Sequence, residues 1–144
     1  MAKSKKEIEQ WKEYRISLLE EKGKSDDDFE KYITFIASGG LGLTLTFVDN
    51  ISPLKESICV WIIILGWFSL GTTLFVNLLS HYISSSNNTK AIQDIDDNLS
   101  YEDIVDNIDK RNLVVSKLNL SSIIALGFGI LCILIFTTIN AYYG

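Results

Sequence analysis

The chain has 144 residues, a formal net charge of −5, one proline and a hydrophobic content of 47%. This length and composition indicate one helical domain rather than a β-sandwich or barrel. The acidic balance excludes nucleic acid as a main partner, because phosphate binding needs clustered lysine and arginine. Charged residues lie almost wholly in two blocks, residues 3–31 and 90–117. Such segregation predicts an all-α membrane protein, since a soluble globule spreads its charges over its surface.

The N-terminal segment, residues 1–31, is expected to be helical and cytoplasmic. Ser4 and Glu7 form an S-x-x-E capping box, which predicts an amphipathic helix that begins there and ends near Gly23. This helix either packs on neighbouring parts of the chain, or lies on the membrane surface or docks a partner. Its many glutamates disfavour a purely membrane-surface helix, because the cytoplasmic leaflet is anionic.

A second helix is expected to start at Ser25 and to run into the first apolar span, residues 32–48. Three aspartates follow Ser25, where negative charge stabilises the first turn of a helix. A metal site is the less favoured interpretation of these aspartates, because successive carboxylates on a helix point in different directions.

The first span contains a glycine cluster. A phosphate loop is disfavoured here, because no Gly-Lys-Ser/Thr follows and both flanks are apolar. Three glycines within four residues weaken helix propensity, which predicts a hinge or bend at Gly39, Gly40 and Gly42.

The second span, residues 58–79, contains no charged residue. As a helix it is about 33 Å long, enough to cross a hydrocarbon core of about 30 Å. Ser52 is expected to cap this helix and Pro53 to be its first residue, after a tight turn. Together the first two spans predict a transmembrane helical hairpin over residues 32–80.

Polar residues form a stripe along the second span. Ser69, Thr73 and Asn77 recur every fourth residue, and His81 continues the series just beyond the span. Two interpretations stay open, a helix-packing face that makes interhelical hydrogen bonds or the lining of a pore. Because the charge of a histidine side chain ordinarily changes near neutral pH, His81 is a candidate gate, although a lone histidine at a helix end is more often simply interfacial.

Residues 81–118 are expected to form an acidic cytoplasmic helical hairpin. Its predicted linker covers residues 84–88, and Ser100 is expected to cap a further helix with Glu102 and Asp103 in the first turn. An EF-hand calcium loop is excluded, because leucine and valine occupy the positions that need glycine and glutamate.

The third span and a short external C-terminus occupy residues 119–144. Two faces of small residues, one on the first span and one on the third, predict close helix contact, because small side chains let backbones approach. The members of these faces are Ser38, Gly42, Thr46, Ser121, Ala125 and Gly129. With a single histidine and no C-x-x-C pair, the sequence predicts neither a metal site nor a cofactor.

Basic residues set the expected orientation. Eight of the 13 precede the first span, one lies in the turn after it, and four lie in the hairpin. The positive-inside rule therefore predicts a multi-pass inner-membrane protein with a cytoplasmic N-terminus and an external C-terminus. Three separate small or polar faces exceed what one three-helix protomer needs for its own contacts, which predicts a homo-oligomer in the lipid bilayer.

A pattern of apolar residues and glycine runs through the first span and into the second. Its members are Phe29, Lys31-Tyr32-Ile33, Ala37-Ser38-Gly39-Gly40-Leu41-Gly42-Leu43, Leu45, Phe47 and the later Ile64-Leu65-x-Trp67. With this pattern, residues 8–80 resemble a class of small, poorly characterised bacterial multi-span membrane proteins, some of them associated with anti-phage defence. The resemblance implies a membrane effector that disturbs the inner membrane when a cytoplasmic sensor is triggered, and it brings no catalytic residue.

The sequence therefore favours an oligomeric channel or membrane-perturbing effector whose cytoplasmic segments receive a signal. The alternative is a non-conducting scaffold or accessory subunit that recruits a cytoplasmic protein partner. An enzyme is not expected, because the sequence offers no nucleophile with a base, no paired intramembrane carboxylates and no cofactor motif.

Overall fold

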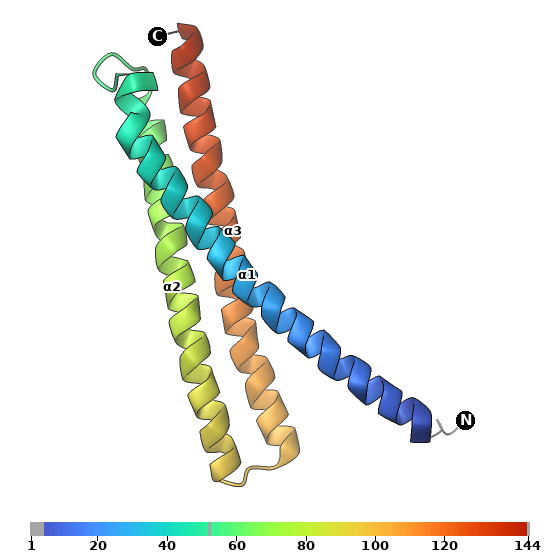
Figure 1. Cartoon of the computed structure of the whole chain (residues 1–144). Helices are drawn as coiled ribbons and strands as arrows, with labels where there is room; N and C mark the ends of the chain where they lie inside the picture. Colours follow the sequence, from blue (N-terminus) through green and yellow to red (C-terminus); the bar gives the residue numbers. More distant parts are fainter. Residues whose placement is uncertain (1–4, 52, 144) are drawn as a thin grey trace. The chain divides into compact units, whose positions relative to one another are not determined.

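The computed structural model describes residues 5–51 and 53–143 and contains three long helices (Figure 1). They are α1 (Lys5–Ile51), α2 (Val60–Asp96) and α3 (Tyr101–Tyr143). No strand occurs within the described ranges, which confirms the predicted all-α class. Each helix contains a stretch that is long and apolar enough to cross a membrane.

The chain divides into two compact units, residues 1–32 and 33–144. In the first unit α1 runs without interruption through Gly23 and Ser25, so the predicted helix end and second helix start are wrong. A glycine inside a helix costs only about 1 kcal/mol relative to alanine, which a long helix tolerates. The predicted capping box at Ser4 and Glu7 lies outside the described side chains.

The three aspartates of the first unit therefore lie inside a helix rather than at its start. Asp26 is 3.7 Å from Lys22, and Asp28 is 3.7 Å from Lys31. Both pairs join residues on adjacent turns of α1, an arrangement that supports a continuous helix.

In the second unit the remainder of α1 packs antiparallel against α2. Near one end of the contact Trp67 donates its indole N–H to the Thr44 hydroxyl (2.9 Å). Near the other end Asn77 donates its amide N–H to the Thr34 hydroxyl (2.9 Å). The glycine cluster lies inside this continuous stretch of α1, so the hinge stays a prediction.

The connection from α1 to α2 is longer than predicted, because α2 begins at Val60 rather than at Pro53. Pro53 instead opens a turn in which its carbonyl accepts the backbone N–H of Glu56 (3.0 Å). The predicted cap, Ser52, lies outside the described residues. The residue that precedes α2 is Cys59, whose positive φ of 58° places it in the left-handed region.

The α2–α3 pair forms an antiparallel hairpin along its whole length (Figure 1). The linker predicted over residues 84–88 is wrong, because these residues continue α2 as helix. Within them, the Asn87 amide reaches the Arg111 carbonyl on α3 (3.5 Å). A polar composition alone does not end a helix whose small side chains pack against a neighbour.

The turn between α2 and α3 confirms the predicted cap. Ser100 accepts the backbone N–H of Asp103 (3.2 Å) and donates its hydroxyl to the Asp103 carboxylate (2.6 Å), and Glu102 lies beside it in the first turn of α3. This arrangement satisfies backbone donors that the helix cannot pair internally and stabilises the start of α3.

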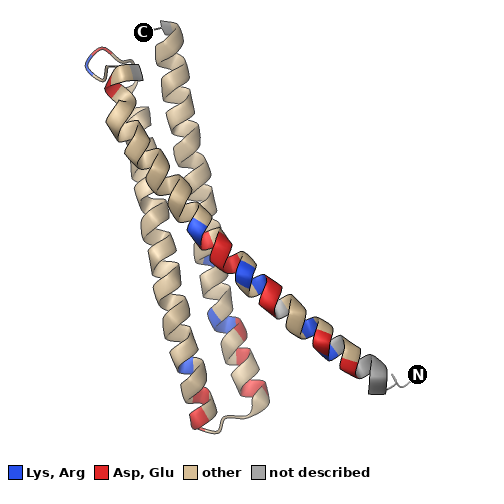
Figure 2. Ribbon diagram, in the orientation of Figure 1, with Lys and Arg blue, Asp and Glu red and all other residues tan. Residues whose placement is uncertain are grey.

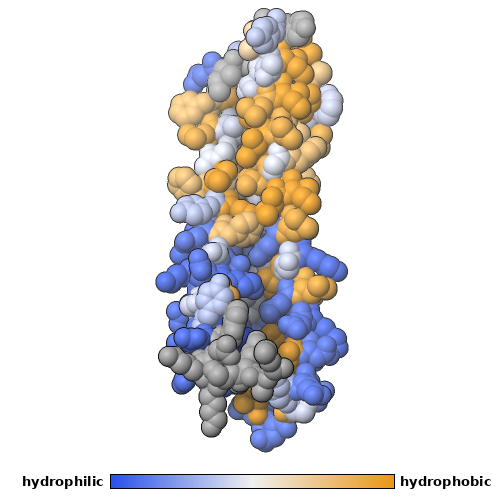
Figure 3. Space-filling model, turned by 90° about the vertical axis from the view of Figure 1, so that its right-hand side faces the viewer, coloured by the Kyte–Doolittle hydropathy of each residue, from blue (hydrophilic) through white to orange (hydrophobic). Residues whose placement is uncertain are grey.

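Charge divides the α2–α3 pair into two halves. The apolar half consists of residues 60–80 and 119–143, and it contains no lysine, arginine, aspartate or glutamate (Figure 2). The polar half consists of residues 81–96 and 101–118, and it carries the charged block. Hydrophobic residues gather over the apolar half in the space-filling view (Figure 3).

Candidate functional site

The polar stripe of α2 lies inside the helix bundle. Thr73 is fully buried, Asn77 is 6% exposed and Ser69 is 9% exposed. Ser69 donates its hydroxyl to the backbone carbonyl of Ala125 on α3 (2.8 Å), and Thr73 donates to the carbonyl of Ser69 within α2 (3.0 Å). Asn77 reaches α1 through Thr34, so the stripe contacts both neighbouring helices.

The stripe continues to Ser80 and not to His81. Ser80 is fully buried and donates its hydroxyl to the Asn119 side chain on α3 (2.6 Å), whereas His81 is exposed. The reason is helical geometry. Four residues turn the helix by about 40° more than one full turn, so a residue three such steps along the chain points about 120° away from the first one. A search with a period of 3.6 residues would have found Ser80.

The backbones of α2 and α3 approach closely at Gly66 and Gly129. A Cβ atom at Gly129 would be 3.0 Å from Leu70 Cδ2 and 3.1 Å from the Gly66 carbonyl oxygen. A Cβ atom at Gly66 would be 3.1 Å from Ile133 and 3.2 Å from the Gly129 carbonyl oxygen. Only glycine fits at both positions without displacing a neighbour. Sequence reasoning identified Gly129 and missed Gly66, whose spacing of three residues from Ser69 was the available signal.

The other predicted small residues are used differently. On α1 the predicted face, Ser38, Gly42 and Thr46, is exposed, and both hydroxyls donate to carbonyls of α1 itself. Nothing lies within 4 Å of a Cβ placed at Gly42. On α3 Ser121 is exposed, while Ala125 accepts the hydrogen bond described above.

One buried hydroxyl has no hydrogen-bond partner among the described residues, that of Ser122 on α3. The antiparallel register pairs Ser69 with Ala125 and Ser80 with Asn119. Ser122 lies between these two contacts on α3, and it therefore faces the middle of the stripe on α2.

Asn140 is a second buried polar residue that sequence reasoning missed. Its side-chain oxygen accepts the backbone N–H of Ile58 (2.7 Å), and its amide donates to the carbonyls of Ile58 (3.1 Å) and Phe136 (2.9 Å). One side chain of α3 thus satisfies both backbone groups of Ile58, just before α2 begins. An asparagine inside an apolar span was the available signal.

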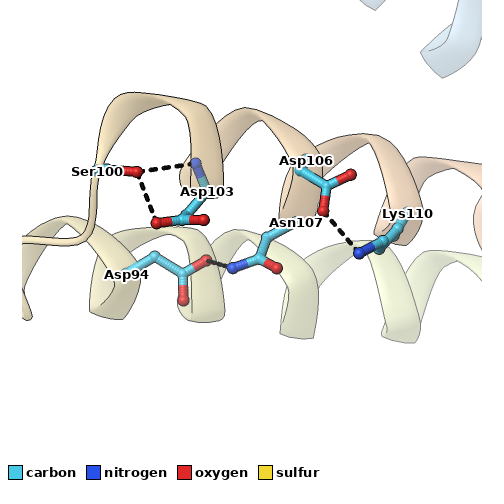
Figure 4. A network of polar contacts seen from close by, with 6 residues as sticks. All are labelled: Asp94, Ser100, Asp103, Asp106, Asn107 and Lys110. Atoms are coloured by element: carbon cyan, nitrogen blue, oxygen red, sulfur yellow. Dashed lines mark hydrogen bonds and ion pairs between the residues drawn. The ribbon is translucent and has the colours of Figure 1, made fainter.

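In the polar half, an ion pair joins the two helices. Arg111 lies 2.8 Å from the Asp94 carboxylate, and their side chains are only 20% and 14% exposed. Asn107 also reaches Asp94 (3.4 Å), next to the Ser100 cap in the same network of polar contacts (Figure 4). Charge-assisted contacts of this kind hold α2 and α3 together where water is nearby.

An exposed ion pair lies beside this network. Lys110 donates to the Asp106 carboxylate one turn away on α3 (2.6 Å), and this hydrogen bond raises the pKa of Lys110 above its ordinary value (Figure 4). Both cysteines are free thiols, with Cys59 half-buried and Cys132 buried. The described residues include no group of three or more His, Cys, Asp or Glu side chains that could hold a metal ion.

Comparisons with known proteins add no relative: no family model, curated protein or solved structure matches the chain. The apolar half is fastened by neutral hydrogen bonds and a glycine contact, and the polar half presents a capped, ion-paired helical hairpin.

Proposed function

We propose that the protein is a membrane-anchored, non-conducting scaffold that recruits a cytoplasmic partner through the polar half of α2–α3. The observation that carries this proposal is the burial of the α2 stripe. Thr73 and Ser80 are fully buried within a single chain, and their hydroxyls are hydrogen-bonded inside the bundle.

A pore lined by this stripe would need these side chains to face water. Here Ser69, Asn77 and Ser80 instead bond to α1 or α3. Opening a water-filled path along them would break all three contacts, each worth about 0.6 kcal/mol on average between helices in a membrane, and would also separate the Gly66–Gly129 contact. The geometry therefore favours the packing interpretation.

The anchor and its orientation follow from composition. Three helices contain stretches suited to crossing a bilayer. The basic residues cluster in the N-terminal segment and the polar half, and the positive-inside rule predicts that both lie on the cytoplasmic side of a bacterial inner membrane. A stiff helical hairpin that extends the second and third spans would then stand in the cytoplasm.

A second candidate function is a homo-oligomeric channel or membrane-perturbing effector that acts in anti-phage defence. One observation favours it: the face of Ser38, Gly42 and Thr46 on α1 is small and exposed. Faces of this type allow two membrane helices to approach closely. In such an oligomer, any conducting path would lie between chains rather than along the α2 stripe.

Ion flux in proteoliposomes separates the two functions. With a potassium gradient and a potential-sensitive dye, we expect the purified full chain to leave the diffusion potential unchanged. The scaffold proposal would be overturned if the chain conducts, if Asn77→Leu abolishes the flux and if the exposed control Asn112→Leu keeps it. That result would identify the stripe as a pore lining. If Gly42→Leu abolishes the flux and Asn77→Leu keeps it, the result would support the oligomeric channel instead.

A further inference from the structure

The polar half carries large apolar side chains that are exposed. We name four of them the tip patch: Ile92 and Ile95 near the end of α2, and Tyr101 and Val105 at the start of α3. Their exposed fractions are 60%, 60%, 78% and 38%. Exposed apolar residues are expected in the apolar half, where lipid covers them, but in a charged hairpin a cluster of them indicates a contact surface.

Helical spacing places the tip patch on one flank of the α2–α3 pair. Asp94 on α2 and Ile104 on α3 are partly buried on the inward side of their helices. Ile95 and Val105 each follow an inward residue by one position, about 100° round the helix. In two antiparallel right-handed helices, the positions that follow the inward residues point to the same flank.

In the apolar half, α1 already covers this flank. Trp67 follows the inward-facing Gly66 by one position, and it donates its indole N–H to Thr44 of α1 (2.9 Å). Leu70 follows the inward-facing Ser69 in the same way and would meet a Cβ placed at Gly40 of α1 at 3.5 Å. The tip patch therefore continues a surface that, farther along the same two helices, is built to receive a helix.

The charged residues around the tip patch indicate what kind of helix would bind there. Sequence position and helical spacing place three exposed acidic residues beside the tip patch: Asp96, Glu102 and Asp109. The two lysines of the hairpin nearest to it, Lys90 and Lys110, precede inward positions and so point to the opposite flank. A second copy of this chain would bring the same acidic border against itself, and like charges oppose such a contact.

We propose that the tip patch is the docking surface for an amphipathic helix with a basic border, supplied by a cytoplasmic partner protein. The proposal rests on the proposed function in placing the hairpin in the cytoplasm, and it names the surface and chemistry by which the partner is recruited. Apolar contact supplies the affinity, and the acidic border favours cationic helices over acidic ones.

The test uses the full chain in detergent and a labelled model peptide of about 18 residues, long enough for five helical turns, built from leucine and lysine with amphipathic spacing. Fluorescence anisotropy measures binding, and empty micelles give the background. The matched probe replaces every lysine with glutamate. We expect the lysine peptide to bind at least about tenfold more tightly than the glutamate peptide, with affinity falling as salt rises.

Two double variants test the location of binding. Ile95→Ser with Tyr101→Ser removes half of the tip patch, and we expect this double variant to bind the lysine peptide about tenfold or more weakly. The control, Leu113→Ser with Val114→Ser, removes two exposed apolar residues of the polar half that lie outside the patch. Circular dichroism verifies that both variants keep their helix content.

Three outcomes would overturn the docking proposal: equal binding by the patch and control variants, equal binding of the two peptides, or a dimer of the free chain that the patch variant dissociates. The last outcome would assign the patch to a second copy. The flux assay judges the scaffold function separately. If the chain conducts ions but binds the peptide at the patch, the scaffold function is wrong and the docking surface is still supported.

Discussion

The two halves of the α2–α3 pair use the same two helices but hold them together by different means. In the apolar half the backbones meet at Gly66 and Gly129, and neutral side chains bond across the interface. In the polar half the interface relies on the Asp94–Arg111 ion pair.

The difference fits the surroundings that we propose for each half, lipid around the apolar half and water around the polar half. Lipid tails are as apolar as leucine, so apolar burial does not draw helices together there, and close packing and hydrogen bonds must do so. Next to water a charged pair retains part of its hydration, and its remaining burial makes the contact directional. Each half should therefore be sensitive to a different kind of substitution.

The largest expected effect is in the apolar half. Gly129→Leu places side-chain atoms where a Cβ alone would lie 3.0 Å from Leu70, and it should lower the free energy of unfolding in detergent by about 3 kcal/mol. Gly127→Leu is the matched control, because nothing lies within 4 Å of a Cβ at Gly127. Equal destabilisation by the two variants would show that α2 and α3 do not meet at this glycine.

In the polar half, removal of one ion-pair partner should matter more than removal of both. Asp94→Ala leaves the Arg111 guanidinium largely buried without its carboxylate and should cost about 2 kcal/mol of unfolding free energy. Asp94→Leu combined with Arg111→Met should cost less, since no charge is then left behind. A double variant that is as unstable as the sum of its single variants would contradict this account of the polar half.

Two buried serines of the apolar half are expected to respond in opposite ways to replacement by alanine. Ser80→Ala removes the hydrogen bond to Asn119 and should lower the free energy of unfolding by about 1 kcal/mol. Ser122→Ala removes a buried hydroxyl that has no partner among the described residues, and it should be neutral or stabilising. The pair is well matched, because both side chains are fully buried. Thermal unfolding of both variants in one detergent would decide the sign of each effect.

The smallest effect is expected at the exposed Lys110–Asp106 pair. The hydrogen bond raises the pKa of Lys110, so any stability that it adds is present at neutral pH and below. That contribution is lost only as pH rises through the raised pKa. Lys110→Met should therefore leave the unfolding midpoint at pH 7 nearly unchanged. A large shift at neutral pH would assign this pair a role in holding the hairpin.

Local signals predicted the parts of this fold that depend on few contacts. The Ser100 cap needs only the residues of one turn, and the three apolar stretches need only composition. Gly129 was also identified, because small residues at helical spacing are typical of close packing.

Contacts between helices explain two of the predictions that were wrong, the start of α2 and the linker over residues 84–88. Nothing near Pro53 in the sequence indicates that Asn140, far along the chain, takes the backbone groups of Ile58 and lets α2 begin at Val60. The composition of residues 84–88 is typical of a linker, and only their packing against α3 explains why they are helical. The continuation of the stripe to Ser80 was missed for a simpler reason, the use of a period of four in place of 3.6.

The most direct measurement of the central claim is the reactivity of a thiol within the stripe. With Cys59 and Cys132 replaced by alanine, Thr73→Cys in proteoliposomes is treated with a charged, membrane-impermeant methanethiosulfonate reagent, and His81→Cys serves as the exposed control. Because the stripe packs α2 against α1 and α3, we predict that the thiol at position 73 stays unmodified while the thiol at position 81 reacts. Rapid modification at position 73 would place the stripe in water and contradict the account.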